Sequence, residues 1–459
     1  MVALPRNNIS GSQMQSPSKS YFAQRVVYPR ERPSIMRKHI YTGAMGNIWM
    51  LLISGIFFVY FGTAIGLSRF QWGLMAGISS WLIAAQPLSA LLTERTGKRK
   101  AVWFYFAFAE RGIRLVGILL SLWLWRAGWP HAGVVLMVAV CLSNFFGGMA
   151  TPAWLSWLAD IIPADQHGAF WGRRTAWMAL SAVSVVVPAG FFADRMPQEY
   201  KLYAMVAIFV VATAVGMLDL IIHRTIPEPI PLMSERMHFL SRILKPIQDC
   251  NFRPWLTFNM CWTFSMTLGG VLAAIYFLDE LGIKENFLGG TVVLTCFMLL
   301  GSLLTGRWSG RLVDRVGTTR VLFWGHIFWA MLPLFWLVAS PRTALLWLGA
   351  SSLLGGVAST AATTAASKLI TRRPPPEFRA MYIAVSTSLA SLAGGLGVVT
   401  AGTILHYLGD WTLELTWFDL GAFRLLFIAS LCLRLGSTLF LVRRIGVQTT
   451  IEEGLNSKV

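Results

Sequence analysis

The chain has 459 residues, of which 55% are hydrophobic and 13% charged, and its formal net charge is +18. Soluble globular chains usually carry about 25% charged residues, and burial in a soluble fold is limited by surface-to-volume scaling. The composition therefore excludes an ordinary soluble protein and indicates a bilayer as solvent. The basic residues lie in short gaps between apolar stretches, without a basic domain that contains interleaved aromatic residues, so no nucleic-acid partner is predicted.

Residues 1–40 form a polar tail without the apolar region and cleavage site of a signal peptide. Twelve apolar stretches follow, and a spanning helix needs roughly 20 apolar residues. They begin near Ala44, Phe70, Ala101, His131, Thr175, Lys201, Pro254, Phe287, Val321, Thr343, Arg379 and Phe418. The predicted fold class is therefore all-α integral membrane, with twelve transmembrane helices.

A polar segment separates the sixth stretch from the seventh, which indicates two six-helix bundles. The predicted parts are a tail at 1–40, an N-terminal bundle at 41–222, a linker at 223–253, a C-terminal bundle at 254–443 and a tail at 444–459. In the linker, one helical face gathers Met233, Met237, Leu240, Leu244 and Ile247. A short basic helix on the membrane surface and a solvated connector both fit this pattern.

The distribution of Lys and Arg predicts the orientation. Of the 39 basic residues, 29 lie in the two tails, the linker and the alternate loops on the same side. Because cytoplasmic segments carry an excess of Lys and Arg, both termini and the linker are predicted in the cytoplasm. The predicted location is a cytoplasmic (inner) membrane. The five cysteines are isolated and suggest neither a disulfide framework nor a zinc site.

Two loops share a motif. The loop after the eighth stretch, residues 310–320, reads GRLVDRVGTTR, and the loop after the second, residues 90–100, reads ALLTERTGKRK with the same spacing. The glycines at 97 and 317 are 220 residues apart, which indicates a duplicated six-helix unit. This pattern resembles the signature loop of the major facilitator superfamily, G-x-L-x-D-R-x-G-x-x-R. Glu94 stands where that signature has Asp.

The resemblance implies that the two loops form a conformational latch on the cytoplasmic side. It implies that Asp314 acts with Arg315, and Glu94 with Arg95, to hold the outward-facing state. Asp160 at the end of the fourth stretch is a further expected partner, and Arg173 and Arg174 lie nearby in sequence. The small residue at Gly310 permits close helix approach, and Gly97 and Gly317 permit tight turns. The resemblance also implies a secondary transporter that works by alternating access.

Ionisable residues inside spanning helices are functional candidates. Glu110 and Arg114 are four residues apart in the third stretch and share a helix face, so they are predicted as an intramembrane ion pair. A proton or ion site at Glu110 stays open as the alternative. His326 is predicted to have a structural role.

Neutral polar residues occur on the helices that the resemblance places around the substrate cavity. They are Asn47, Tyr60, Asn144, Asn259, Trp262, Thr263, Thr363 and Thr364. Each is a candidate for solute contact, and each equally fits a hydrogen bond between helices. These helices carry no ionisable residue in their predicted central portions, which favours a neutral or amphiphilic solute, with a lipophilic monocation as a further option.

The predicted function is secondary transport of such a small solute, with the bilayer as surroundings and a proton or ion as an optional coupling partner. The alternative is a non-transporting relative that acts as a sensor or assembly factor and uses the basic tail to bind a partner. No catalytic motif, metal-ligand cluster, cofactor motif or phosphate-binding loop is found, so neither an enzyme nor a cofactor is predicted.

Overall fold

A computed structural model gives the fold, and it describes residues 22, 24–67, 69–230, 239–270, 273, 276–277, 281, 295–408, 411–414 and 419–445. Several sequence-based predictions lie outside these residues. They are the start of the eighth stretch at Phe287, the start of the twelfth at Phe418, the linker positions Met233 and Met237, and most of both tails.

The first half of the chain is a bundle of six membrane spans. Its helices are α1 (Arg32–Ser54), α2 (Ile56–Ala64), α3 (Arg69–Ile83), α4 (Gln86–Thr96), α5 (Arg99–Arg126), α6 (Ala132–Ile161), α7 (His167–Arg195) and α8 (Lys201–His223). The short 3-10 helix η1 (Ala164–Gln166) precedes α7. Two of the six spans are each made of two helices, α1 with α2 and α3 with α4.

The second half repeats this arrangement after the linker helix α9 (Phe239–Gln248). Its elements are α10 (Arg253–Gly270), α13 (Phe297–Val316), α14 (Thr318–Ala330), α15 (Leu332–Val338), α16 (Ala344–Arg372), η4 (Pro376–Phe378), α17 (Arg379–Leu408), α18 (Ala422–Ser437) and the π-helical turn η5 (Thr438–Val442). The antiparallel strands β1 (Thr412–Glu414) and β2 (Asp419–Gly421) lie between α17 and α18.

Breaks within spans occur at residues that cannot continue a helix. Gly55 separates α1 from α2 with an extended backbone. Pro87 and Pro333 stand in the first turns of α4 and α15. Proline lacks the backbone N–H and clashes with the preceding turn, so a helix breaks before it. The sequence pattern predicted single stretches here, and the structure divides three of them.

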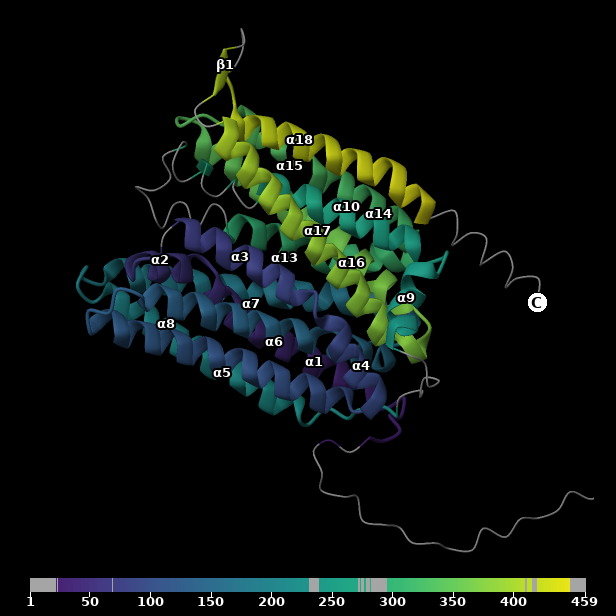
Figure 1. The fold of residues 1–459 in the computed structure, drawn as a ribbon. Helices are drawn as coiled ribbons and strands as arrows, with labels where there is room; N and C mark the ends of the chain where they lie inside the picture. Colours follow the sequence, from purple (N-terminus) through teal and green to yellow (C-terminus); the bar gives the residue numbers. More distant parts are fainter. Residues whose placement is uncertain are drawn as a thin grey trace, which may run out of the picture.

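The two halves lie one above the other in Figure 1, with the purple-to-teal helices α1 to α8 below and the green and yellow helices α14 to α18 above. Each half has its own apolar core. The larger core of the first half includes Phe57, Phe61 and Phe209, and that of the second includes Trp255, Phe258 and Tyr382. The twelve-helix, two-bundle fold predicted from the sequence is confirmed.

Membrane burial explains this composition. Within the described residues, nine helical segments are long and apolar enough to cross a membrane. Of the other three spans, α5 carries Glu110, Arg111 and Arg114 in its middle, and α10 and α13 border stretches outside the described residues. The chain is an integral membrane protein.

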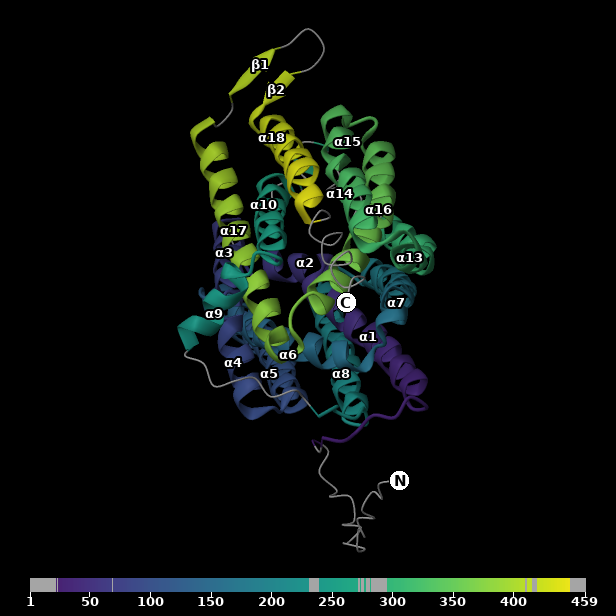
Figure 2. The same cartoon turned by 90° about the vertical axis from the view of Figure 1, so that its right-hand side faces the viewer.

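Two helix pairs form part of the contact between the halves, where α17 also packs on α3 and α6. In one pair α7 packs on α13, where a Cβ atom on Gly172 or Gly310 would overlap backbone atoms of the opposite helix. In the other, α4 packs on α17, where Ala90 is fully buried against Ala380 and Met381. Small residues at these positions permit close approach of the backbones. Figure 2 shows α9 beside α17 near the second pair.

Candidate functional site

The loops that carry the duplicated motif lie on one face of the molecule, here called the loop face. It comprises residues 94–100, 160–169, 314–320 and 371–380. Gly97 and Gly317 have positive φ angles of 67° and 102° and end α4 and α13. Such angles strain residues with a Cβ, so the expectation of glycine-dependent turns is confirmed.

Asp314 joins the two halves of the molecule. Its carboxylate accepts hydrogen bonds from the backbone N–H groups of Gly168 (3.1 Å) and Ala169 (2.8 Å) in the first turn of α7. The Lys368 ammonium of α16 donates to the same carboxylate at 2.7 Å. A carboxylate at a helix N-terminus is stabilised by unpaired N–H groups and by the helix dipole. Asp314 therefore stabilises the contact between α13 and α7.

Glu94, the matching acid of the first half, has a different partner. The Arg242 guanidinium of the linker helix α9 donates to it at 2.8 Å, and both side chains are at most 6% exposed. The backbone N–H of Met381, in the first turn of α17, interacts with the same carboxylate. Glu94 thus connects the first half to the linker and to the second half.

Asp160 forms the third connection on the loop face. It accepts hydrogen bonds from Arg99 of its own half at 2.5 Å and from Arg379 at the start of α17. Nearby, Arg372 donates to the carbonyl of Ile162. The hydrogen bonds and ion pairs between described residues of the two halves all lie on the loop face. This face is closed.

The basic residues beside the two acids do not pair with them. Arg95 and Arg315 are exposed, and the ion pairs found among the described residues do not include either one. Asp314 pairs with Lys368, and Glu94 pairs with Arg242. Both partners are distant in sequence, and no local pattern indicates them. Arg95 and Arg315 stand in the last helical turns, where basic residues complement the helix dipole.

The linker and the N-terminal segment also dock on the loop face. Gln24 donates to the carbonyl of Gly97 at 2.5 Å, and the N–H of Arg25 donates to the carbonyl of Glu228 at 3.0 Å. The Glu228 carboxylate accepts the Arg99 N–H at 2.7 Å. Burial raises the pKa of Glu228. The linker helix α9 exposes Leu240 and Leu244, two residues of its predicted apolar face.

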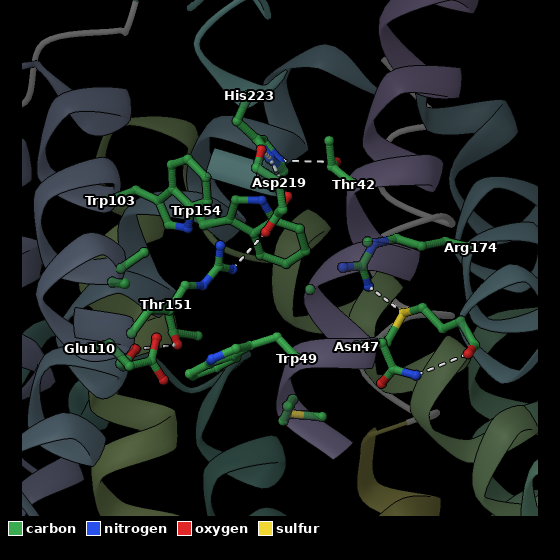
Figure 3. Close-up of a pocket in the computed structure, with 18 residues that line it drawn as sticks. Thr42, Asn47, Trp49, Trp103, Glu110, Thr151, Trp154, Arg174, Asp219 and His223 are labelled. Atoms are coloured by element: carbon green, nitrogen blue, oxygen red, sulfur yellow. Dashed lines mark hydrogen bonds and ion pairs between the residues drawn. The ribbon is translucent and has the colours of Figure 1, made fainter. Parts of the chain in front are cut away.

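A cavity of about 270 Å³ lies inside the first half. Residues of α1, α5, α6, α7 and α8 line it, among them Asn47, Trp49, Trp103, Glu110, Arg111, Thr151, Trp154, Arg174, Asp219 and His223. Figure 3 shows charged groups that point into this space from several sides, with indole rings between them. The volume is near the low end of the range of small-molecule sites, about 300–1,000 Å³.

Three buried side chains form a network in the cavity wall. Arg111 of α5 donates to Asp219 of α8 at 2.6 Å and to the Gly216 carbonyl, and its guanidinium lies over the Trp49 ring. Asp219 also contacts the Nδ1 atom of His223 at 2.8 Å, and the other ring nitrogen contacts Thr42. A buried charge needs such pairing.

Glu110 and Arg114 do not form the predicted ion pair. Arg114 donates to Ser143 at 3.0 Å and to the Asn144 side-chain oxygen at 2.5 Å. The Glu110 carbonyl accepts a hydrogen bond from Ser143 at 2.9 Å. No hydrogen bond or ion pair to another described residue is found for the Glu110 carboxylate, which lines the cavity next to Gly147. Their spacing puts both on one face of α5, but α6 supplies neutral partners for Arg114.

Arg174 of α7 is the other cation in the cavity wall. Its guanidinium donates to the sulfur of Met178 at 3.1 Å and lies over the rings of Trp154 and Trp171, 4.8 and 5.5 Å from their centroids. Its Nε atom is buried and has no hydrogen-bond partner in the part of the chain that the structure describes. Arg174 is the eighth residue of α7 (His167–Arg195), outside the central portion for which the sequence predicted no ionisable residue, and it supplies a cation to this cavity.

Of the eight neutral candidates, Asn47 lines this cavity, and its amide donates to the Met178 carbonyl at 2.9 Å. Two others form hydrogen bonds between helices: Asn144 donates to Ser79, and Asn259 donates to Ser386. Tyr60 accepts a hydrogen bond from Gln198.

The candidates of the second half lie in helix contacts. Trp262 packs on His326, with ring centroids 4.4 Å apart, and the Thr263 methyl group lies near Gly394. Thr363 donates to the Ser359 carbonyl. Thr364 is buried, and its hydroxyl has no hydrogen-bond partner among the described residues. His326 itself contacts the Leu322 carbonyl at 2.7 Å and packs among aromatic rings.

Comparisons with known proteins agree with this fold. The sequence model of the Major Facilitator Superfamily matches residues 254–453. The E. coli fucose:proton symporter FucP aligns with 90% of this chain and 98% of its own, at 14% identity and a TM-score of 0.63. The proton:xylose symporter XylE aligns with 90% of this chain and 95% of its own, at 17% identity and a TM-score of 0.64.

A third similar structure is a bacterial homologue of the iron transporter ferroportin, at 15% identity and a TM-score of 0.61, with 90% of this chain and 98% of that chain covered. No curated protein matches the sequence. The two six-helix bundles and the duplicated loop define an integral membrane protein with a transporter fold. The second half of the chain is thus similar in sequence to the Major Facilitator Superfamily, and the chain shares the fold of these three structures.

Proposed function

We propose that this protein is a secondary transporter that moves a small solute across the membrane by alternating access. The observation that carries the proposal is the closed loop face, where Asp314 and Asp160 join the halves through charged hydrogen bonds. Such contacts can break and re-form without disturbing the core of either half, which is what a gate requires. The sequence similarity and the fold support this class of function.

We further propose that the loop face is cytoplasmic, so that the structure represents an outward-facing state. The excess of Lys and Arg on this side supports the assignment. Two similar proteins, FucP and the ferroportin homologue, were solved in outward-facing states. The proposed location is the cytoplasmic membrane, with both termini inside.

Cysteine labelling tests this orientation. Single cysteines at Ser18, Gln248 and Ser457 should resist membrane-impermeant maleimides in intact cells and react after the cells are opened. A cysteine at Arg342, in a predicted external loop, should react in intact cells and serves as the positive control. Labelling of any of the first three from outside would reverse the proposed orientation.

Transport itself is tested with purified full-length protein. A broad solute panel is screened for an increase in thermal stability, because a ligand of the folded state stabilises it. Uptake of each stabilising solute is then measured in proteoliposomes. Gly172→Ala should reduce uptake about tenfold, an effect equivalent to about 1.4 kcal/mol, because its methyl group overlaps the Gly306 carbonyl on closure.

Gly190→Ala, on the same helix, is the matched control. A Cβ atom at Gly190 would have no described atom of a neighbouring helix within 4 Å. This variant should transport as the parent protein does. A stabilising ligand without measurable flux in any preparation would favour the alternative, a sensor or assembly factor. Equal uptake by Gly172→Ala and the parent would contradict the gating role of the contact between α7 and α13.

A further inference from the structure

The charges around the cavity of the first half do not balance. Arg111 and Arg174 line the cavity, as do the carboxylates of Glu110 and Asp219. Arg114, buried one helical turn from Glu110 on α5, adds a third guanidinium group beside the cavity. These groups carry one more positive than negative charge, and protonation of Glu110 or of His223 would increase that positive excess. An uncompensated buried charge costs several kcal/mol. An anionic group entering this cavity would bring the sum to zero.

Arg174 is the cation whose geometry leaves room for that group. Arg111 is paired with Asp219, and Arg114 is held by Ser143 and Asn144. Among the described residues, Arg174 has no carboxylate partner: its neighbours are the Met178 sulfur and two indole rings. Its guanidinium lies flat against Gly43, where a Cβ atom would fall 2.6 Å from Nε. Figure 3 shows it pointing into the cavity.

The rest of the wall sets the shape and polarity of the solute. The rings of Trp49, Trp103 and Trp154 line the space together with Met50 and Met178. Such walls suit an apolar or aromatic body. The carboxylates of Glu110 and Asp219 line the same space and would repel a second negative charge.

Part of the cavity wall is exposed on α6 and α7, the two lining helices that contact the second half. Its partly exposed residues include Met50, Thr151, Trp154 and Met178, which belong to α1, α6 and α7. Arg111, Asp219 and His223 of α5 and α8 are buried in its wall. In Figure 1, α5 and α8 lie on the side of the first half away from the second.

We propose that this cavity is the solute site and that its solute is a small organic monocarboxylate. The carboxylate binds the Arg174 guanidinium, which offers two parallel N–H donors, and the apolar body packs against the indole rings. The proposal rests on the proposed transport function. It differs from the sequence-based prediction of a neutral or amphiphilic solute, because the proposed solute carries one negative charge.

Binding is tested on the purified full-length protein with matched probes. The probes are benzoate and phenylacetate, their neutral amides benzamide and phenylacetamide, the cation benzylammonium and the dianion terephthalate. The expected result is thermal stabilisation by at least one monocarboxylate and none by its amide. Absence of stabilisation by both monocarboxylates, or equal stabilisation by the amides, overturns the proposal.

Variants locate the site. Arg174→Gln should lower the apparent affinity for the monocarboxylate about tenfold or more, as expected for loss of a charge-assisted hydrogen bond. Without ligand it should be at least as stable as the parent, because an uncompensated buried charge is removed. Arg195→Gln, on an exposed cation of the same helix, should bind normally. Unchanged affinity in Arg174→Gln excludes the site.

Failure of the monocarboxylate site and failure of the transport function give different results. Uptake of a neutral solute, sensitive to Gly172→Ala but not to Arg174→Gln, would retain the transporter and reject the monocarboxylate. Carboxylate binding that is lost in Arg174→Gln, with no flux in proteoliposomes, would retain the site and reject transport.

Discussion

Asp314→Asn should open the loop face and slow transport at least about tenfold. The substitution keeps the shape of the side chain but removes the charge that faces Lys368 and the first turn of α7. Hydrogen bonds to charged groups contribute about 1.5–3 kcal/mol, and each 1.4 kcal/mol is about a tenfold change in an equilibrium. Since the contacts with Gly168 and Ala169 exist only when α7 and α13 are together, their loss favours the state in which these helices are apart.

Labelling of a cysteine at Thr371 measures this shift without knowledge of the solute. Thr371 is 1% exposed and contacts His167 across the halves, so its cysteine variant should react slowly. Adding Asp314→Asn should increase the labelling rate about tenfold. Asp165→Asn, on an exposed acid of the adjacent turn, is the control and should not change it. Equal labelling in the Asp314 variant and its parent would show that Asp314 does not hold the face closed.

The fold could be predicted from the sequence because its signals are local. Apolar stretches mark the spans, and the repeated loop with Gly97 and Gly317 marks the duplication. The partners of the two acids could not be predicted, because Lys368 lies 54 residues from Asp314 and Arg242 lies 148 residues from Glu94. Such pairs exist only after the helices have packed.

The contribution of Arg174 to the cavity could not be predicted from the apolar pattern. The fifth span was predicted to start at Thr175, which placed Arg174 in a loop, whereas α7 begins at His167. Basic residues usually mark the end of a span, so the pattern favoured the loop. In the structure Arg174 lies about 10 Å along the helix axis from the start of α7, at 1.5 Å per residue. Cation–π contacts with Trp154 and Trp171 stabilise it there.

The two carboxylates of the cavity should respond to neutralisation in opposite ways. Asp219→Asn leaves the Arg111 guanidinium, 6% exposed, without its anionic partner. Breaking a buried ion pair from one side costs about 3–5 kcal/mol. Glu110→Gln removes a carboxylate for which no ion pair is found among the described residues, so its cost should stay below about 1 kcal/mol.

The two variants are compared by their midpoints of thermal unfolding in detergent. Asp219→Asn and Glu110→Gln each replace one carboxylate of the same cavity by an amide. Asp219→Asn should unfold at a clearly lower temperature, and Glu110→Gln should unfold close to the parent. Adding Arg111→Gln to Asp219→Asn should recover part of the loss, because the unpaired cation is then gone. If Glu110→Gln is the less stable of the two, then Glu110 and Arg114 act as a pair in solution. In that case the neutral partners Ser143 and Asn144 do not suffice for Arg114.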